Sequence, residues 1–291
     1  MGIGLKRIGA ERRFFCEICN MDDYFSEMWN QETNNRLLDF YIEFASALDV
    51  PEEIKKSLSA PLLVHASPSY IENADKRVIL VGKETMGWIG SYQNFCCDMK
   101  HNPEESCKRM MESQAWFMLH DKKSKYKYWQ MYKMMAKRGY NDLLGASQLW
   151  TNLIPVDYHG HSYLGTGRAL QYDKMPSEFI SSLRLYAEKM LKGTINILKP
   201  RIIVFCTGST YDKDLYSFLH IDSKHTVSLR KLPECAAKEE GSIDLTDTVT
   251  FMWNDIRCIR TEHPRKLESR GTKCVKKIVV DTVYNLIESE G

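Results

Sequence analysis

A short apolar segment followed by glycine and an acid constrains this chain most. Residues 78–81 are Val-Ile-Leu-Val, four consecutive apolar residues of which three are β-branched. Such a run is typical of a strand buried on both faces, as in a parallel sheet. Gly82 ends the run where the backbone can turn sharply, and Glu84 follows just beyond the expected end of the strand. Open α/β sheets bind ligands there, although an ordinary strand with a solvated acid fits the pattern too.

Three further segments repeat this combination of a strand and a polar residue. Asn152 interrupts the apolar segment 149–156, Ser209 follows the strand within 200–210, and His263 follows the strand 256–260. Helical periodicity is expected between these strands, at 103–119, 177–198 and 211–219, with another helix at 34–48 before them and one at 274–287 after them. The spacing predicts an α/β fold, a three-layer sandwich with a central, mostly parallel four-stranded sheet.

Composition limits the setting of this fold. The 291 residues balance to a net charge of +2, so any nucleic-acid surface must be a local patch. No apolar run approaches the ~18–20 residues that span a bilayer, so we expect no membrane partner. Nine cysteines and an N-terminus unlike a signal peptide indicate reduced thiols in a cytoplasmic protein.

The chain has no internal repeat and no long flexible linker. We expect residues 1–70 to form an N-terminal helical extension and residues 71–291 to form the α/β domain. The segment near 221–248 has no clear periodicity and is interpreted as an irregular insertion in that domain.

Metal ligands are sparse. Cys16 and Cys19 form a CxxC pair, but no second pair completes a four-ligand zinc site, and His159 and His161 are a weak signal in a loop. We therefore expect no metal and no cofactor.

A basic stretch of the chain has the composition of a nucleic-acid-binding surface. Seven Lys or Arg residues lie between positions 122 and 138, interleaved with aromatic residues. This mixture suits a nucleic-acid surface. It also suits a surface helix whose aromatic stripe packs on the core while its lysines are solvated, and the sequence leaves both interpretations open.

Four segments in order along the chain resemble the motifs of the uracil-DNA glycosylase superfamily. Gly82-Lys83-Glu84-Thr85 resembles its first motif, and Thr151-Asn152-Leu153-Ile154 resembles its base-binding strand. Residues 200–209 resemble its strand and Gly-Ser turn, and His263-Pro264-Arg265-Lys266-Leu267 resembles its last motif. The resemblance spans roughly residues 75–287 and implies a monofunctional DNA glycosylase.

The resemblance also implies roles for individual residues. Glu84 would orient the attacking water, and His263 would stabilise the departing base. Asn152 would hydrogen-bond the Watson–Crick edge of a flipped pyrimidine beside Gly82. The physics of N-glycosidic cleavage, which needs an extruded base and charge placed against an oxocarbenium-like sugar, is consistent with this assignment. The alternative to these functional roles is structural: Asn152 is then a satisfied core amide, and His263 caps a strand end.

The remaining implied contacts surround the base and the DNA backbone. Phe95 is the expected stacking aromatic, with Trp88 as its rival. Ser209, Arg265 and Lys266 would bind phosphates. Leu267 would fill the hole that the flipped nucleotide leaves in the duplex.

This chain departs from the family motifs in both the first and the last of them, and Met86-Gly87-Trp88 is not the usual tyrosine or glycine continuation of the first. Thr85 stands where the first motif has proline, and Arg265 stands where the last motif has a small residue. We therefore expect a deaminated or modified pyrimidine, such as a hypermodified phage cytosine in an anti-phage setting. The alternative is a non-catalytic nucleic-acid-binding protein on the same fold, using the 122–138 stretch and the 263–267 loop.

Overall fold

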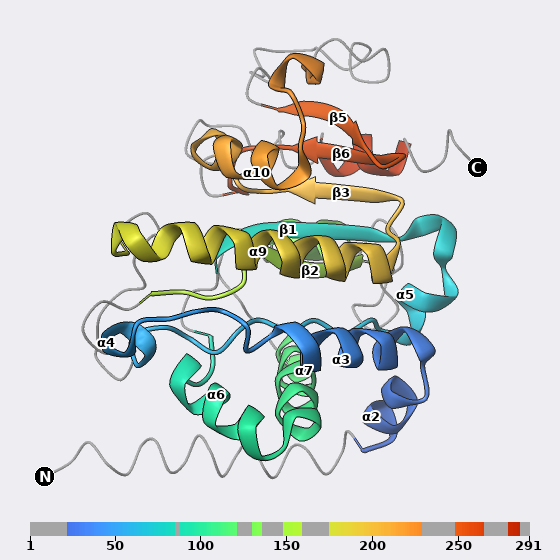
Figure 1. Cartoon of the computed structure of the whole chain (residues 1–291). Helices are drawn as coiled ribbons and strands as arrows, with labels where there is room; N and C mark the ends of the chain where they lie inside the picture. Colours follow the sequence, from blue (N-terminus) through green and yellow to red (C-terminus); the bar gives the residue numbers. More distant parts are fainter. Residues whose placement is uncertain are drawn as a thin grey trace, which may run out of the picture.

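The chain folds around one sheet of six strands in the order β2-β1-β3-β6-β5-β4 (Figure 1). The computed structural model describes the following parts of the chain: residues 22–84, 88–120, 130–135, 148–158, 175–228, 248–264 and 279–285.

Four neighbouring strands of the sheet are parallel, as the sequence predicts. They are β1 (Val78–Glu84), β2 (Gln148–Ile154), β3 (Ile202–Phe205) and β6 (Ile256–Arg260). β1 lies between β2 and β3, and it supplies the apolar run that fills the centre of the sheet. The expectation of an α/β fold with a mostly parallel central sheet is confirmed.

The expected count of four strands is wrong, because an antiparallel pair extends one edge. β5 (Val249–Trp253) pairs with β6, and β4 (Val227–Ser228) pairs with β5. A two-residue turn joins β5 to β6, with φ of 47° at Asn254 and 63° at Asp255. These residue types tolerate the left-handed conformation that such tight hairpin turns require. The segment interpreted as an irregular insertion thus contains β4, after a short helix η4 (Ser223–His225); residues 229–247 lie outside the described part.

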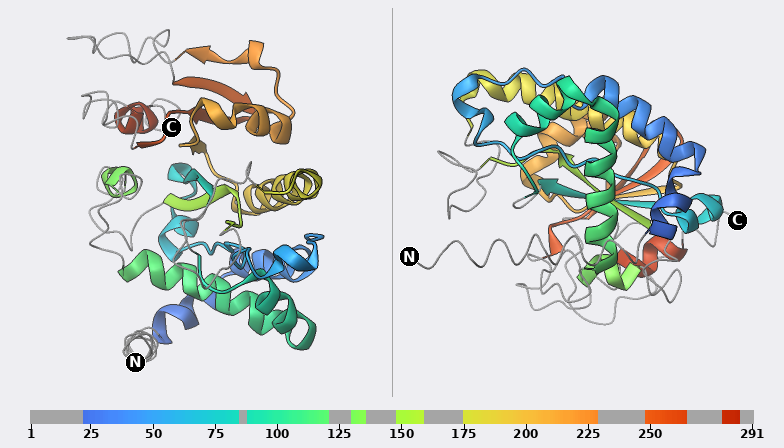
Figure 2. Two further views of the ribbon diagram at one scale, coloured as in Figure 1. Left: turned by 90° about the vertical axis from the view of Figure 1, so that its left-hand side faces the viewer. Right: turned by 90° about the horizontal axis from the view of Figure 1, so that it is seen from below.

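Helices lie on both faces of the sheet (Figure 2). α9 (Ser177–Leu198) and α10 (Asp212–Leu219) cover one face, and an ion pair from Arg184 to Asp214 of 2.7 Å joins them. Helical residues 130–135 and 279–285 cover the other face, where the hydroxyl of Tyr284 donates to the carbonyl of Met135 at 2.7 Å. The arrangement is compatible with a three-layer sandwich.

The residues before the first strand pack against the same core. They form α2 (Asp22–Trp29), α3 (Glu32–Phe44), α4 (Glu52–Lys55), α5 (Pro68–Glu72) and the short η1 (Ala74–Lys76). Residues 57–66 are buried without interruption, and the amide of Leu62 donates to the carbonyl of Pro155 just after β2 at 2.8 Å. One hydrophobic cluster includes α3, α9 and the strands. The division of the chain at residue 70 stays a prediction.

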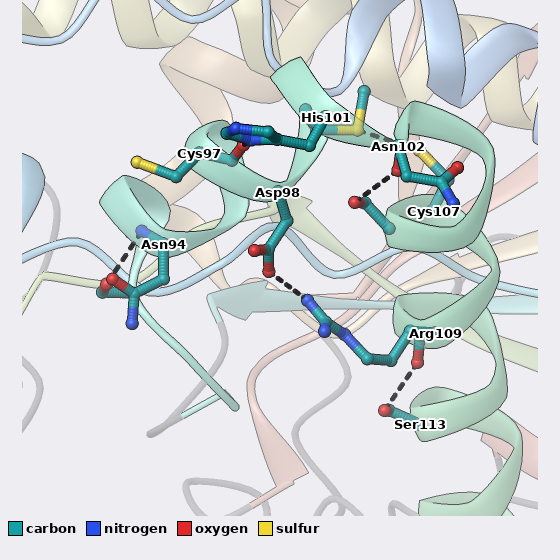
Figure 3. A network of polar contacts seen from close by, with 11 residues as sticks. Asn94, Cys97, Asp98, His101, Asn102, Cys107, Arg109 and Ser113 are labelled. Atoms are coloured by element: carbon teal, nitrogen blue, oxygen red, sulfur yellow. Dashed lines mark hydrogen bonds and ion pairs between the residues drawn. The ribbon is translucent and has the colours of Figure 1, made fainter.

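A helical hairpin follows β1. The sequence predicts only the second of its two helices. α7 (Pro103–His120) corresponds to the helix expected at 103–119, whereas α6 (Tyr92–His101) is not among the helices that the sequence predicts. Figure 3 shows the polar contacts that join them, among them an ion pair between Asp98 and Arg109. Asn102 caps α7, because its side-chain oxygen accepts from the amide of Glu105 at 3.2 Å. Among the described helices, none has the length and apolarity to cross a bilayer.

A buried histidine joins the N-terminal helices to this hairpin. The Nδ1 of His65 lies 2.5 Å from Oε1 of Gln114 on α7, and its Nε2 lies 2.8 Å from the hydroxyl of Tyr24 on α2. Only 3% of His65 is exposed. Burial lowers the pKa of His65 from its ordinary 6.5 to about 4, outweighing the hydrogen bond with Gln114, which acts in the opposite direction.

This depressed pKa makes stability depend on pH. Because the folded chain keeps His65 neutral while the unfolded chain protonates it near pH 6.5, its contribution is complete above that pH and is lost as pH falls towards 4. We expect His65→Gln to remove up to roughly 3 kcal/mol of this dependence. Urea unfolding between pH 4 and 7 measures it, with the exposed His225→Gln as control. If the free energy of unfolding depended on pH in the same way in wild type and in His65→Gln, the lowered pKa of His65 would be contradicted.

Candidate functional site

The strand register aligns the carboxyl ends of the four parallel strands. Gly82 lies beside Asn152, and Val81 lies beside Phe205, which in turn lies beside Arg260. The segments that follow these strands therefore leave the sheet at the same edge. This is the edge at which the sequence predicts a site.

Glu84 is the last residue of β1, which corrects the expectation that the strand ends at Gly82. β2 continues alongside it, and the pair of Glu84 with Ile154 keeps the ladder intact through the glycine. The backbone of Glu84 is thereby fixed next to the strand that carries Asn152. Its side chain lies outside what the structure describes, so its catalytic role stays a prediction.

Asn152 holds a buried amide at this edge. Every residue of β2 is buried, and Asn152 is only 4% exposed. Its Oδ1 accepts from the indole Nε1 of Trp150 at 3.1 Å. Its Nδ2 is buried and has no hydrogen-bond partner among the described residues. A buried donor without a partner is costly, so a core amide satisfied within the described structure does not explain this residue.

An aromatic cluster lies next to this amide. The rings of Trp88, Phe117 and Trp150 meet at centroid distances of 5.8–6.1 Å, and Trp88 meets each of the other two edge-on. Trp88 is 6% exposed, and its Nε1 has no partner among the described residues. The ring contact between Trp88 and Trp150 and the hydrogen bond from Trp150 thus link Trp88 to Asn152.

Phe95, the other predicted stacking residue, lies on α6. It is 2% exposed, and its ring centroid lies 6.3 Å from that of Tyr92, whose hydroxyl bonds to the backbone of Leu48. α6 also lines a cavity of about 260 Å³ with Lys55, but none of the predicted site residues lines that cavity. The contacts therefore connect Trp88, and not Phe95, with the amide.

Ser209 lies at the turn after β3 and contacts a carboxylate that the sequence did not single out. Its amide and its hydroxyl both donate to Oε1 of Glu262, at 3.4 and 3.3 Å. Glu262 is 3% exposed and directly precedes His263, which is half-buried. The donors predicted to bind a phosphate are thus directed at an internal carboxyl group. The only sequence signal for Glu262 is its place between a strand and the His-Pro motif.

Other polar groups reach this edge. Asp157, three residues after β2, is fully buried, and the buried Thr207 after β3 has an Oγ1 without a partner among the described residues. The Nζ of Lys83 lies 4.9 Å from the ring centroid of Tyr211 in η3 (Ser209–Tyr211), which places a cation next to the Ser209 turn.

The described residues offer neither an activated buried thiol nor a cluster of metal ligands. The described cysteines are free, and burial raises the pKa of Cys206 to about 12, which makes that thiol a poor nucleophile. No group of three or more potential ligands in the described residues is arranged to hold a metal ion. The following sequence predictions lie outside those residues: Cys16, Cys19, His159, His161, the basic residues at 122–127 and 137–138, Arg265, Lys266 and Leu267.

The chain matches no protein-family model and no curated protein. The assignment of function therefore rests on the site and on the motifs described above.

Two glycines of positive φ allow a matched test of the turn. A Cβ on Gly208 (φ 69°) would lie 2.7 Å from Oε2 of Glu262, whereas a Cβ on Gly90 (φ 74°) would meet nothing closer than Ala60 at 3.7 Å. The backbone of Gly208, with ψ of 171°, also lies in a region that only glycine adopts readily.

Gly90→Ala should lower the free energy of unfolding by about 1–2 kcal/mol, because its backbone has a positive φ. We expect Gly208→Ala to lower it by at least ~1 kcal/mol more, because its Cβ also meets Glu262. In a Glu262→Ala background the cost of Gly208→Ala should decrease, because the blocking carboxylate is gone. Urea unfolding of the four variants measures both effects. Equal costs in the two backgrounds would show that Glu262 does not press against this turn.

Proposed function

We propose that this protein is a monofunctional DNA glycosylase with a uracil-DNA glycosylase-like three-layer fold. It hydrolyses the N-glycosidic bond of a flipped, deaminated or modified pyrimidine and leaves an abasic site. The observation that carries the proposal is the buried Nδ2 of Asn152, without a partner among the described residues, beside the strand that ends in Glu84. A donor held ready in this way is suited to the polar edge of a base that leaves the stack.

The proposed reaction uses two groups of this edge. Glu84 orients a water whose oxygen forms a bond to C1′ of the deoxyribose as the bond from C1′ to the base nitrogen breaks. The electron pair of that bond leaves with the base, and His263 stabilises the developing negative charge. The base leaves with a proton and the sugar keeps a hydroxyl, so the step needs no metal and no cofactor.

The proposed substrate is a base in DNA, and the proposed setting is the cytoplasm. Lys83 at the edge of the site and the predicted basic stretch at 122–138 supply positive charge near a polyanion. Because the net charge of the chain is only +2, binding depends on these local groups.

The test is formation of abasic sites in labelled oligonucleotides, scored by alkaline cleavage. The panel carries uracil, hypoxanthine, 5-hydroxymethylcytosine and its glucosylated form. We expect product with at least one base, and a loss of roughly 10²–10⁴-fold in rate for Glu84→Gln and for His263→Ala. Glu188→Gln on α9 removes a carboxylate that pairs with Lys192 and His220, so it is the matched control and should retain the rate.

Two results would count against the proposal. A wild-type rate in Glu84→Gln would remove the proposed role of that carboxylate. Salt-sensitive binding without product on every base would favour the non-catalytic nucleic-acid-binding protein instead.

A further inference from the structure

Trp150 and Asn152 form a hydrogen-bonded pair within one strand. They lie two residues apart on β2, so their side chains leave the same face of the sheet. Trp150 is 6% exposed and Asn152 is 4% exposed. The 3.1 Å bond from the indole Nε1 to Oδ1 is therefore shielded from water.

This bond decides which way the amide points. An indole N–H can only donate, so the atom that faces it must be the amide oxygen. Turning the amide over would place its NH₂ against the indole N–H and leave two buried donors without an acceptor. Asn152 therefore directs Nδ2 away from Trp150.

The orientation of the indole is itself fixed by packing. Trp150 meets Trp88 edge-on at 6.0 Å and Phe117 at 5.8 Å, and its backbone pairs with Leu80 in β1. Rings packed in this way resist rotation in a dense interior. Trp150 thus holds the amide in one orientation before any ligand arrives.

We propose that Trp150 is a positioning residue that orients Asn152 to select bases that carry a carbonyl next to a ring N–H. Nδ2 donates to the carbonyl, and the second lone pair of Oδ1 accepts from the ring N–H. Uracil and hypoxanthine present that edge. Cytosine and its 5-substituted derivatives present an amine donor beside a ring acceptor, the reverse pattern. This inference rests on the proposed function, and among the substrates that the motifs leave open it favours deaminated bases over modified cytosines.

The test compares two Trp→Phe variants that make the same chemical change. Trp150→Phe removes the N–H that faces Asn152. Trp29→Phe removes an N–H that donates to Glu112 at 2.8 Å on α7, and serves as the control. For each protein the readout is the ratio of kcat/KM on uracil to kcat/KM on cytosine in otherwise identical oligonucleotides. The intrinsic difference between the two leaving groups cancels when these ratios are compared.

We expect the wild type to prefer uracil and Trp150→Phe to lower the ratio roughly ten- to hundredfold, since a bidentate contact discriminates by about that factor. Trp29→Phe should retain the wild-type ratio. An unchanged ratio in Trp150→Phe would overturn the proposal. A wild type that prefers cytosine or 5-hydroxymethylcytosine would also overturn it, while leaving the proposed glycosylase activity intact.

A second variant and a binding measurement test the proposal if Trp150→Phe does not fold or if no base is released. If Trp150→Phe does not fold, Asn152→Asp replaces it, because an ionised carboxylate offers only acceptors and should lose the preference for uracil. If the wild type forms no product on any base, the proposed function fails, and anisotropy of labelled oligonucleotides then decides the inference. Tighter binding of uracil than of cytosine would support it, and equal affinities would overturn it.

Discussion

The parallel pairing of β1 with both of its neighbours is the constraint on which the rest of this structure depends. The neighbouring strands take up the backbone hydrogen bonds on both edges of β1. The helices on the two faces of the sheet then bury its four consecutive apolar residues. The register of that pairing places Gly82 beside Asn152 and keeps the ladder intact up to Glu84. A shift by one residue would turn the side chain of Asn152 to the opposite face of the sheet and separate it from the proposed site.

Four polar side chains are buried at this edge of the sheet. An amide, two carboxylates and a threonine hydroxyl lie in a nearly dry layer at the ends of the parallel strands; these are Asn152, Asp157, Glu262 and Thr207. Each of them lowers stability unless it is hydrogen-bonded, so the rest of the core must offset them. Groups of this kind are typical of sites that bind polar ligands. The contact of Glu262 with Ser209 also shows how one such group can position a loop.

The sequence predicts the elements whose signal is local. The apolar run 78–81 and the periodic segments that became α7 and α9 correspond to the structure within a few residues. The hairpin of β5 and β6 was missed because its turn uses Asn254 and Asp255 in place of glycine. α6 was missed although its buried residues Tyr92, Phe95 and Met99 recur at helical spacing. The role of Glu262 depends on a tertiary contact with Ser209, which no periodicity encodes. Trp150 contacts Asn152 within one strand, but the spacing of the two residues alone does not indicate a hydrogen bond.

The side-chain amide of Asn152 can be observed directly by NMR. In protein labelled with ¹⁵N at asparagine, the two Nδ2 protons of Asn152 give a pair of signals, which the spectrum of Asn152→Asp identifies by their absence. We expect free uracil to shift these signals and cytosine at the same concentration to leave them in place. Signals that neither base perturbs, or that both bases perturb equally, would contradict the claim that this amide binds a base.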